Sequence, residues 1–413
     1  MFLKNYQHFK KNQIFSGVFL FLISFFIRIP IIIIFGDESL EYEWENLVFN
    51  LVHNGKLVWH TFDNGFLLPN SWMPPLYAYY LYLFTFLGLE NQNYILLILY
   101  SQALIAALSI MLFYNLNKLF FSNKVSFYSS LVFSFFPLYL YACSQVSSIS
   151  LQVFLTIAFL YFFFLVKKKK NIIYLLFFSF ISGLLILLRG EFWFVYLLSI
   201  IYLFTFLKIP LKKIVLIFLI TLITTSPYLI RNFLIFEKVM VLNSFGFNLW
   251  KGNHPYAKEN SIIVGSLIVN DSIIKKTEAI KIDNFYRIHW DKVFLNEALK
   301  NIKSDLVGHF IFYIKKAIFF ILIDFKSTTT NYWNPLHYIP LILISIGSIL
   351  GILVSNKKSM ELNYLLFTFL INVAIFSTVS IMPRYKLVIL PVQIIFTAIL
   401  FEFLKKKLKK KIN

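Results

Sequence analysis

Hydrophobic residues occur in long uninterrupted runs along this chain, without the 3.6-residue or two-residue spacing of a one-sided helix or strand. A helix needs roughly 20 consecutive apolar residues to cross a bilayer core, whereas a transmembrane β-barrel shows short segments of alternating polarity. The pattern predicts an all-α, polytopic transmembrane bundle of about 10–11 spans with further helices in its outer loops. The predicted spans are residues 14–35, 94–116, 125–142, 148–166, 171–188, 191–207, 212–230, 336–354, 361–380 and 386–404.

Composition supports a membrane protein. Apolar residues make up 59% of the 413 residues and charged residues 14%, which excludes a soluble globular protein. The first apolar run is too long for a signal-peptide core, and no small-residue cleavage site follows it, so we expect a retained anchor. Cys143 is the only cysteine, so neither an intramolecular disulfide nor a cysteine metal site is expected. We predict a single integral-membrane domain over residues 1–413.

Basic residues, 39 against 19 acidic ones, set the expected orientation. Their clusters fall on one side of the membrane if both termini are cytoplasmic. This places two large loops, 36–93 and 231–305, at the outer face, and loop 36–93 holds seven acids and one base, Lys56. We expect a multi-pass protein of the bacterial inner (plasma) membrane. The clusters are Lys4, Lys10 and Lys11, Lys118 and Lys124, 167–170, Lys208, Lys212 and Lys213, Lys357 and Lys358, and 405–411.

Two apolar segments do not fit as spans. Residues 306–323 carry Lys315 and Lys316 in the middle, and counting them as a span would put the lysine-rich C-terminus outside. We expect an interfacial or re-entrant segment whose lysines reach the lipid headgroups, with a true span as the alternative. Residues 76–89 follow two prolines and are short, so they predict a helix at the outer face.

Scarce carboxylates gather where the first predicted span ends, in "FGDESLEYEWENL" (35–47). If this stretch is helical, Asp37, Glu41 and Glu45 share one face, where like charges repel and favour a cation, a hydroxyl to be activated, or protonation. The alternative is structural, because acids suit a helix N-terminus and Asp37 could cap one. The position at the membrane surface favours a function.

Other features limit the chemistry. Neither GxxxxGK[ST] nor GxGxxG after a strand is present, and no large segment is expected in the cytoplasm. We therefore expect chemistry at the outer face on a substrate that arrives in the membrane already activated. Arg28 lies within a predicted span, where an unpaired charge is costly. Glu191 is a possible partner for it, and a local Arg189–Glu191 pair is the alternative.

Five stretches resemble, in the same order, the motifs of the GT-C integral-membrane glycosyltransferases. The similarity is greatest to bacterial family 39-type enzymes, which include relatives of the protein O-mannosyltransferases and the lipid A aminoarabinose transferases. In the first stretch Arg28 precedes the Asp37–Glu38 pair, then Tyr42 and Gly55. The stretches are "RIPIIIIFGDESLEYEWENLVFNLVHNG" (28–55), "WMPPLYAYYLYLFTFLGL" (72–89), "LLRGEFW" (187–193), "TTSPYLIRNFLIFEKVMVLNSFGFNLWKGNHP" (224–255) and "PRYKLVILP" (383–391).

The resemblance implies transfer of a sugar from a polyprenyl-phosphate donor to an acceptor hydroxyl of a cell-envelope glycan, lipid or protein, with inversion. The leaving phosphate needs cations, and the acceptor hydroxyl needs a general base. Asp37 is the expected base, with Glu38 or Glu41 positioning the acceptor or a cation. The expected ligands of the donor phosphate are Arg231, Lys251, His254 and Arg384.

The resemblance is incomplete at one position that bears on metals. Relatives often carry a second acid in the next outer loop, but "YACSQVSSISLQVFL" (141–155) has none. The histidines also lack metal-ligand spacing, so no cofactor and no metal ligand set are expected, although a divalent ion at the first-loop acids is the open alternative. No nucleic-acid partner is expected.

Other functions stay open from the sequence. A lipid-linked-oligosaccharide flippase or transporter would need charged or broken helices and inverted repeats, which are not evident. An enzyme of the O-antigen polymerase or ligase type also acts on lipid-linked substrates, and the sequence separates it poorly. A non-catalytic scaffold would not need the acidic cluster.

The lysine clusters generate a test of topology. Reporter fusions at residues 60 and 270 should be extracytoplasmic, and fusions at 169 and 413 should be cytoplasmic. A cytoplasmic reporter at 60 would move the acidic cluster to the wrong side for the proposed chemistry. An outer C-terminal reporter would show instead that 306–323 crosses the membrane.

Overall fold

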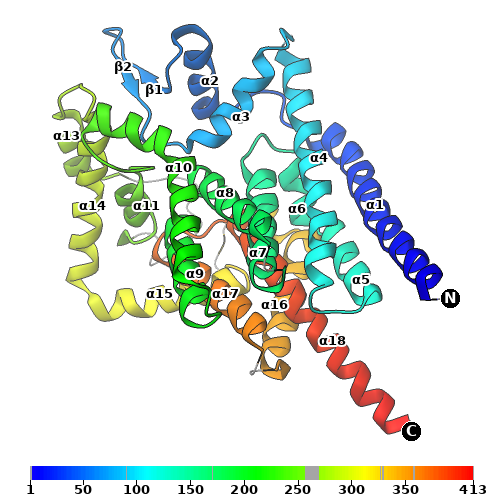
Figure 1. Ribbon diagram of the computed structural model, residues 1–413. Helices are drawn as coiled ribbons and strands as arrows, with labels where there is room; N and C mark the ends of the chain where they lie inside the picture. The colour runs from blue at the N-terminus through cyan, green and yellow to red at the C-terminus, as the bar shows by residue number, and fades with distance from the viewer. Residues whose placement is uncertain are drawn as a thin grey trace.

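The computed structural model is a bundle of helices with one small hairpin (Figure 1). It describes residues 2–89, 91–169, 171–255, 269–325, 327, 330–356 and 359–412. The first half contains α1 (Phe2–Phe35), α2 (Tyr42–Asn54), β1 (Val58–Thr61), β2 (Leu67–Pro69), α3 (Pro75–Thr85), α4 (Asn91–Asn117), α5 (Asn123–Ser134), α6 (Pro137–Cys143), α7 (Ile149–Lys169) and α8 (Ile172–Leu188). The second half contains α9 (Phe192–Thr205), α10 (Leu211–Phe236), α11 (Phe245–Lys251), α13 (Asp271–Glu278), α14 (Tyr286–Ser304), α15 (Leu306–Ile321), η1 (Thr330–Trp333), α16 (Pro335–Val354), α17 (Met360–Thr378), η2 (Pro383–Val388) and α18 (Leu390–Ile412).

The all-α membrane class is confirmed, and every predicted span coincides with a helix or a bent helix pair. Within the described residues, six helices are long and apolar enough to cross a membrane: α1, α4, α7, α10, α16 and α17. A seventh span is possible if α5 and α6 count as one, although they meet at 56° because Pro137 starts a new helix. The helices α8 and α9 are shorter, with 17 and 14 residues, and the apolar part of α18 runs into the lysine tail.

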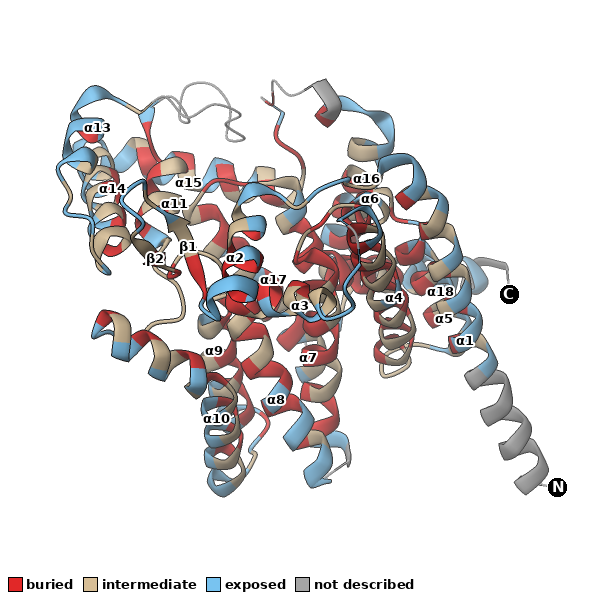
Figure 2. Cartoon of the chain, turned by 90° about the horizontal axis from the view of Figure 1, so that it is seen from above, coloured by how far each residue is buried: buried red, intermediate tan, exposed pale blue. Residues whose placement is uncertain are grey.

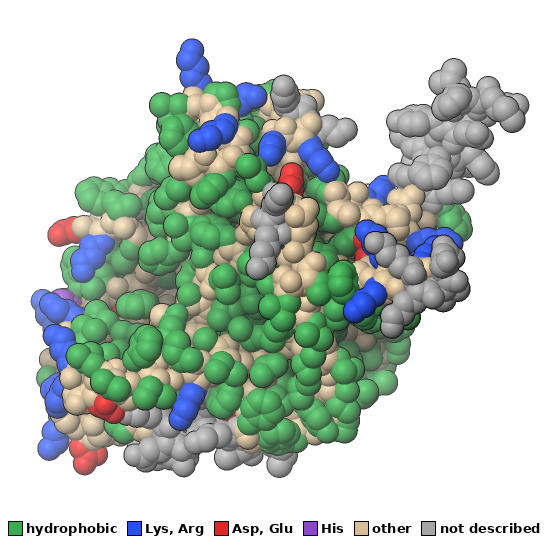
Figure 3. Space-filling view, turned by 90° about the horizontal axis from the view of Figure 1, so that it is seen from below, with side chains coloured by type: hydrophobic (Ala, Val, Ile, Leu, Met, Phe, Trp, Pro, Cys, Tyr) green, Lys and Arg blue, Asp and Glu red, His purple; other side chains and the backbone are tan. Residues whose placement is uncertain are grey.

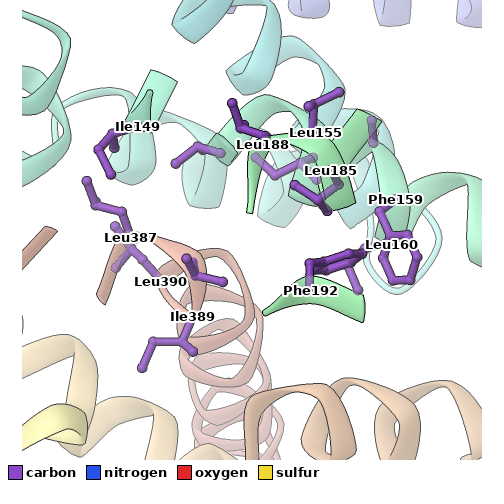
Figure 4. Close-up of a cluster of buried hydrophobic side chains, with 14 of the residues drawn as sticks. Ile149, Leu155, Phe159, Leu160, Leu185, Leu188, Phe192, Leu387, Ile389 and Leu390 are labelled. Carbon is purple, nitrogen blue, oxygen red and sulfur yellow. The ribbon is translucent and has the colours of Figure 1, made fainter. Parts of the chain in front are cut away.

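Of the six helices that could cross a membrane, α7 is buried over the largest share of its length; it lies in the middle of the bundle and contacts α4 and α8 (Figure 2). Its buried side chains Ile149, Leu155 and Phe159 meet residues of α8 and α9 (Figure 4). Leu387 and Ile389, in and directly after η2, belong to the same cluster. The short helix η2 is therefore held against the core of the bundle. Seen from below, hydrophobic side chains cover most of the surface, and most Lys and Arg side chains lie near its edges (Figure 3).

The two outer loops build the part of the molecule that lies away from both termini (Figures 1 and 2). Loop 36–93 forms α2, the antiparallel hairpin β1–β2 and α3, so the predicted short helix within 76–89 is confirmed. Loop 231–305 contributes α11, α13 and α14 among its described residues, and α11 packs against α14. Both termini project from the opposite side of the bundle (Figure 1).

The amphipathic helix α15 packs on α17 and differs from expectation in one lysine. Lys315 is exposed, but Lys316 is fully buried and donates hydrogen bonds to Gly252 O at 3.0 Å and Asn253 Oδ1 at 3.1 Å. The prediction that both lysines reach lipid headgroups is therefore wrong for Lys316. Its ammonium lies over the ring of Phe312 and fastens the loop after α11.

Lys316 should contribute to stability while its neighbour does not. Replacing Lys316 by Met keeps much of the side-chain length but leaves the oxygens of Gly252 and Asn253 without this donor. We expect the free energy of unfolding to fall by about 1–3 kcal/mol, measured in detergent by thermal or denaturant unfolding. Lys315→Met is the matched control and should be neutral. Equal stability of the two variants would contradict this role of Lys316.

Candidate functional site

Asp37 lies in the turn that follows α1 and is held by the loop between α6 and α7. Its backbone N–H donates to Ser144 O at 3.1 Å, and its Oδ2 accepts from Val146 N–H at 2.6 Å. The side chain is half-buried. Burial raises the pKa of the Asp37 carboxyl, and the Val146 hydrogen bond lowers it by a smaller amount. The result is a fixed carboxylate of increased basicity at the end of the first span.

The α6–α7 loop is also the place where relatives often carry a second acid. The side chain of Gln145 donates from Nε2 to Phe35 O at 2.8 Å, and the backbone carbonyl of Gln145 accepts from Gln102 Nε2 at 2.9 Å. Gln102 Oε1 in turn accepts from the Tyr77 hydroxyl at 2.7 Å. The loop therefore supplies amide groups that position Asp37, and within 141–155 it contributes no carboxylate.

Arg28, two and a half turns before Asp37, braces the same loop from inside the bundle. It is fully buried, and Nε donates to Cys143 Sγ at 3.4 Å while Nη1 donates to Ser24 O at 2.7 Å. Neither of the two predicted pairs, Arg28–Glu191 and Arg189–Glu191, is observed among the described residues. In the described chain no ion pair joins Glu191 to either arginine, and Arg189 donates from Nε to Gln152 Oε1 at 2.8 Å.

The conditional prediction of one helical face for the acids is wrong, because α2 begins only at Tyr42. The Asp37 N–H is directed to Ser144, so α1 cannot continue, and Glu41 is extended at the N-cap of α2. Glu38 and Glu41 are exposed, whereas Glu43 is half-buried. These acids therefore line an irregular segment that leads from the membrane boundary into α2.

Glu43 is the functional candidate that the sequence did not single out. Burial raises the pKa of its carboxyl, and the negative charge of Glu41 raises it further. The positive charges of Arg287, Arg384 and Lys251 act in the opposite direction. Glu43 thus lies where cations from three separate parts of the second half of the chain converge. No local motif marks it apart from its place in the acidic stretch.

Lys251 and Arg384, both predicted phosphate ligands, are brought together. Burial lowers the pKa of Lys251, the like charge of Arg384 lowers it further, and Glu43 raises it. Lys251 ends α11, and Arg384 lies in the first turn of η2. Among the described residues, neither side chain donates a hydrogen bond or lies within 4.0 Å of a carboxylate oxygen. Their N–H groups are available to a ligand.

The other two predicted phosphate ligands have different surroundings. Arg231 donates from Nη1 to Asn70 O at 2.6 Å and from Nη2 to Leu57 O at 3.0 Å, which fastens the two ends of the hairpin segment to α10. His254 is buried and stacks on Trp250 with ring centroids 5.2 Å apart. Burial lowers the pKa of His254. The geometry favours structural roles for both.

The short helix α11 is oriented so that Lys251 points to this site. Asp291 of α14 accepts from the backbone N–H groups of Gly246 and Phe247 at 3.0 and 2.9 Å, at the start of α11. A Cβ on Gly246 would lie 2.2 Å from Asp291 O, so only glycine allows this approach. At the other end, a Cβ on Gly252 would lie 2.3 Å from the carbonyl carbon of Val379.

Arg287 lies in the corner formed by the rings of Trp72 and Trp290, which meet at 85°. The Cζ atom is 3.7 Å from the ring centre of Trp72 and 3.8 Å from that of Trp290. Burial lowers the pKa of Arg287 to about 10, although Asp291 and Glu43 favour its charged form. In the sequence, the tryptophans in the loops 36–93 and 231–305 were the only indication of this cluster.

A metal ion has little to bind here. Among the described residues, no group of three or more His, Cys, Asp or Glu side chains is arranged to hold one. The carboxylates of Asp37 and Glu43 are also associated with different neighbours.

Comparisons with known proteins show what this chain is similar to. Residues 73–230 match the family model described as dolichyl-phosphate-mannose-protein mannosyltransferase, and comparison with curated proteins finds no match. The oligosaccharyltransferase of Archaeoglobus fulgidus in its apo form is similar with a TM-score of 0.58 and 14% identity, over 96% of this chain and 52% of that chain. Its complex with Zn and sulfate has a TM-score of 0.54 and 14% identity, over 94% and 49%. ArnT from Cupriavidus metallidurans bound to undecaprenyl phosphate has a TM-score of 0.39 and 14% identity, over 94% and 76%.

The family match and the shared fold confirm the resemblance to the GT-C superfamily of membrane glycosyltransferases. The matched family segment runs from just before α3 into α10 and covers less than half of the chain. This chain spans about half the length of the oligosaccharyltransferase chains that it matches. The family and these structural neighbours are glycosyltransferases.

Proposed function

We propose that this protein transfers a sugar from a polyprenyl-phosphate donor to an acceptor hydroxyl at the outer face of a bacterial inner membrane, with inversion at the sugar. The acceptor belongs to a cell-envelope glycan, lipid or protein. The name of the matching family, which includes a dolichyl-phosphate sugar, supports a lipid-phosphate donor. Transfer from such a donor requires no cytosolic nucleotide, in agreement with the absence of nucleotide-binding motifs.

The observation that carries the proposal is the pair of cations Lys251 and Arg384, whose charges act on each other and on Glu43 and which donate no hydrogen bond in the described chain. The phosphate of the donor is a diester with one negative charge, and it leaves as a monoester that carries close to two. Lys251 is half-buried and Arg384 is exposed, and cations already in place beside the phosphate stabilise the added charge with little reorganisation. They therefore favour the transition state over the bound donor.

Asp37 is the proposed general base. Inversion requires the acceptor oxygen to attack the anomeric carbon from the side opposite the phosphate. Asp37 is held by Val146 in the α6–α7 loop, whereas Lys251 and Arg384 act on Glu43, so the base and the cations lie beside different parts of the acidic segment. The acceptor O–H proton passes to Asp37, a bond forms from the acceptor oxygen to the anomeric carbon, and the electron pair of the broken C–O bond goes to the phosphate.

The remaining acids would support this reaction from the acceptor side. Glu38 and Glu41 are exposed next to Asp37 and can position the acceptor hydroxyl or a cation. Glu43 faces the cations without pairing with them within 4.0 Å in the described chain. It can keep Lys251 and Arg384 charged and oriented until the phosphate binds.

Loss of the base should abolish most of the activity. Asp37→Asn keeps the shape of the side chain and cannot accept the proton, so turnover should fall roughly 10²–10⁴-fold. The measurement is mass spectrometry of the envelope glycan in a deletion strain that carries either form of the gene, followed by kinetics with the identified donor. Glu45→Gln, an exposed acid outside the site, is the control and should be silent.

The pH dependence gives a second readout of the same prediction. Burial raises the pKa of Asp37, so the active carboxylate is present above that raised pKa and is lost as the pH falls through it. The acid limb of the rate profile should disappear in the Asp37→Asn enzyme. Normal turnover of Asp37→Asn, together with an inactive Glu41→Gln, would show that the general base is Glu41 and not Asp37.

A further inference from the structure

The setting of Arg287 differs from that of every cation assigned above. Its guanidinium is enclosed by Trp59, Trp72 and Trp290, which we call the tryptophan clamp. Trp59 belongs to β1, Trp72 precedes α3 and Trp290 lies in α14, so the clamp joins the two outer loops. The rings of Trp72 and Trp290 meet at 85°, so the guanidinium is enclosed in the corner between them. This packing restricts its orientation, which reduces the entropy lost when it binds a ligand.

This cation is desolvated but has no oxyanion. Nε of Arg287 is buried and makes no hydrogen bond, and in the described chain its guanidinium forms no ion pair within 4.0 Å. Asp291 is one turn away, but its two carboxylate oxygens accept from Gly246 and Phe247 N–H. Removing a charge from water is unfavourable unless a partner replaces the lost hydration. An anion bound by Arg287 would be such a partner.

The position of Arg287 separates it from the proposed donor site. The groups that act on Lys251 are Arg384 and Glu43, whereas those that act on Arg287 are Asp291, Tyr286 and Glu43. Glu43 is the neighbour that both share, whereas neither Lys251 nor Arg384 is among the groups that act on Arg287. One continuous phosphate would be repelled by this carboxylate, so the arrangement suits two separate anionic groups.

We propose that Arg287 and the tryptophan clamp bind the acceptor, and that the acceptor is an acidic sugar carrying a carboxylate or phosphate oxyanion. This inference rests on the proposed function and names the acceptor class for it. A guanidinium forms two parallel hydrogen bonds with either oxyanion, which gives orientation as well as affinity. All three tryptophans are partly exposed, so their ring edges can contact the apolar face of the attached sugar ring.

Tryptophan fluorescence of the full-length protein in detergent can measure this binding without any donor or transfer. The probes are glucuronate and glucose 6-phosphate, which distinguish a carboxylate from a phosphate source, and glucose as the neutral control. We expect saturable changes with at least one acidic sugar and none with glucose. Arg287→Gln should weaken that binding about 10- to 100-fold, and Arg287→Lys, which keeps the charge but loses the fork, by a smaller factor.

The matched control is Arg384→Gln, which removes a cation of the donor site and should leave acidic-sugar binding unchanged. Thermal unfolding establishes that each variant is folded. If Arg287→Gln does not fold, the binding of Arg287→Lys is compared with that of the unchanged protein instead. Unchanged binding in the Arg287 variants, an equal loss in Arg384→Gln, or an equal response to glucose would each overturn the proposal. Because no transfer is measured, acidic-sugar binding that survives an inactive enzyme would separate this inference from the proposed function.

Discussion

A cation buried in a membrane protein must find oxygen atoms to replace the water it has lost. Arg231, Lys316 and Lys386 direct their hydrogen bonds to backbone carbonyls, and they connect segments that are distant in sequence. Lys251 and Arg384 have no such acceptors among the described residues. The first three, the scaffold cations, connect parts of the fold. Lys251 is half-buried and Arg384 is exposed, and the proposed function assigns these two to the donor phosphate.

The scaffold cations hold the two proposed phosphate ligands in place. Lys316 ties the loop after Lys251 to α15, and Asn253 in that loop donates to Thr378 O at 2.8 Å, at the end of α17. Lys386 donates to Phe319 O of α15 at 3.1 Å and so fixes η2, which carries Arg384, against the helix that also contains Lys316. Two elements from distant parts of the sequence, the end of α11 and η2, are therefore both held against α15.

Much of the fold could be predicted from the sequence because long apolar runs have few alternatives to membrane helices. The acidic turn and the helix at α3 were predicted from the residues next to these runs, whereas Lys251 and Arg384 were named from the family resemblance and their role stays a proposal. The start of α2 could not be predicted, because it depends on the hydrogen bond from Asp37 N–H to Ser144 O, more than a hundred residues away. For the same reason the partners of Arg231 and the clamp around Arg287 were not visible: both are contacts between the two outer loops.

The division of the cations is tested most directly by the affinity of two matched variants for farnesyl phosphate, measured by calorimetry in detergent. Arg384→Lys removes the fork that would hold the phosphate and should weaken binding about tenfold. Arg231→Lys should leave the affinity unchanged and lower the unfolding temperature, because its guanidinium supports the hairpin. Weaker binding in Arg231→Lys at unchanged stability, with a silent Arg384→Lys, would contradict the account.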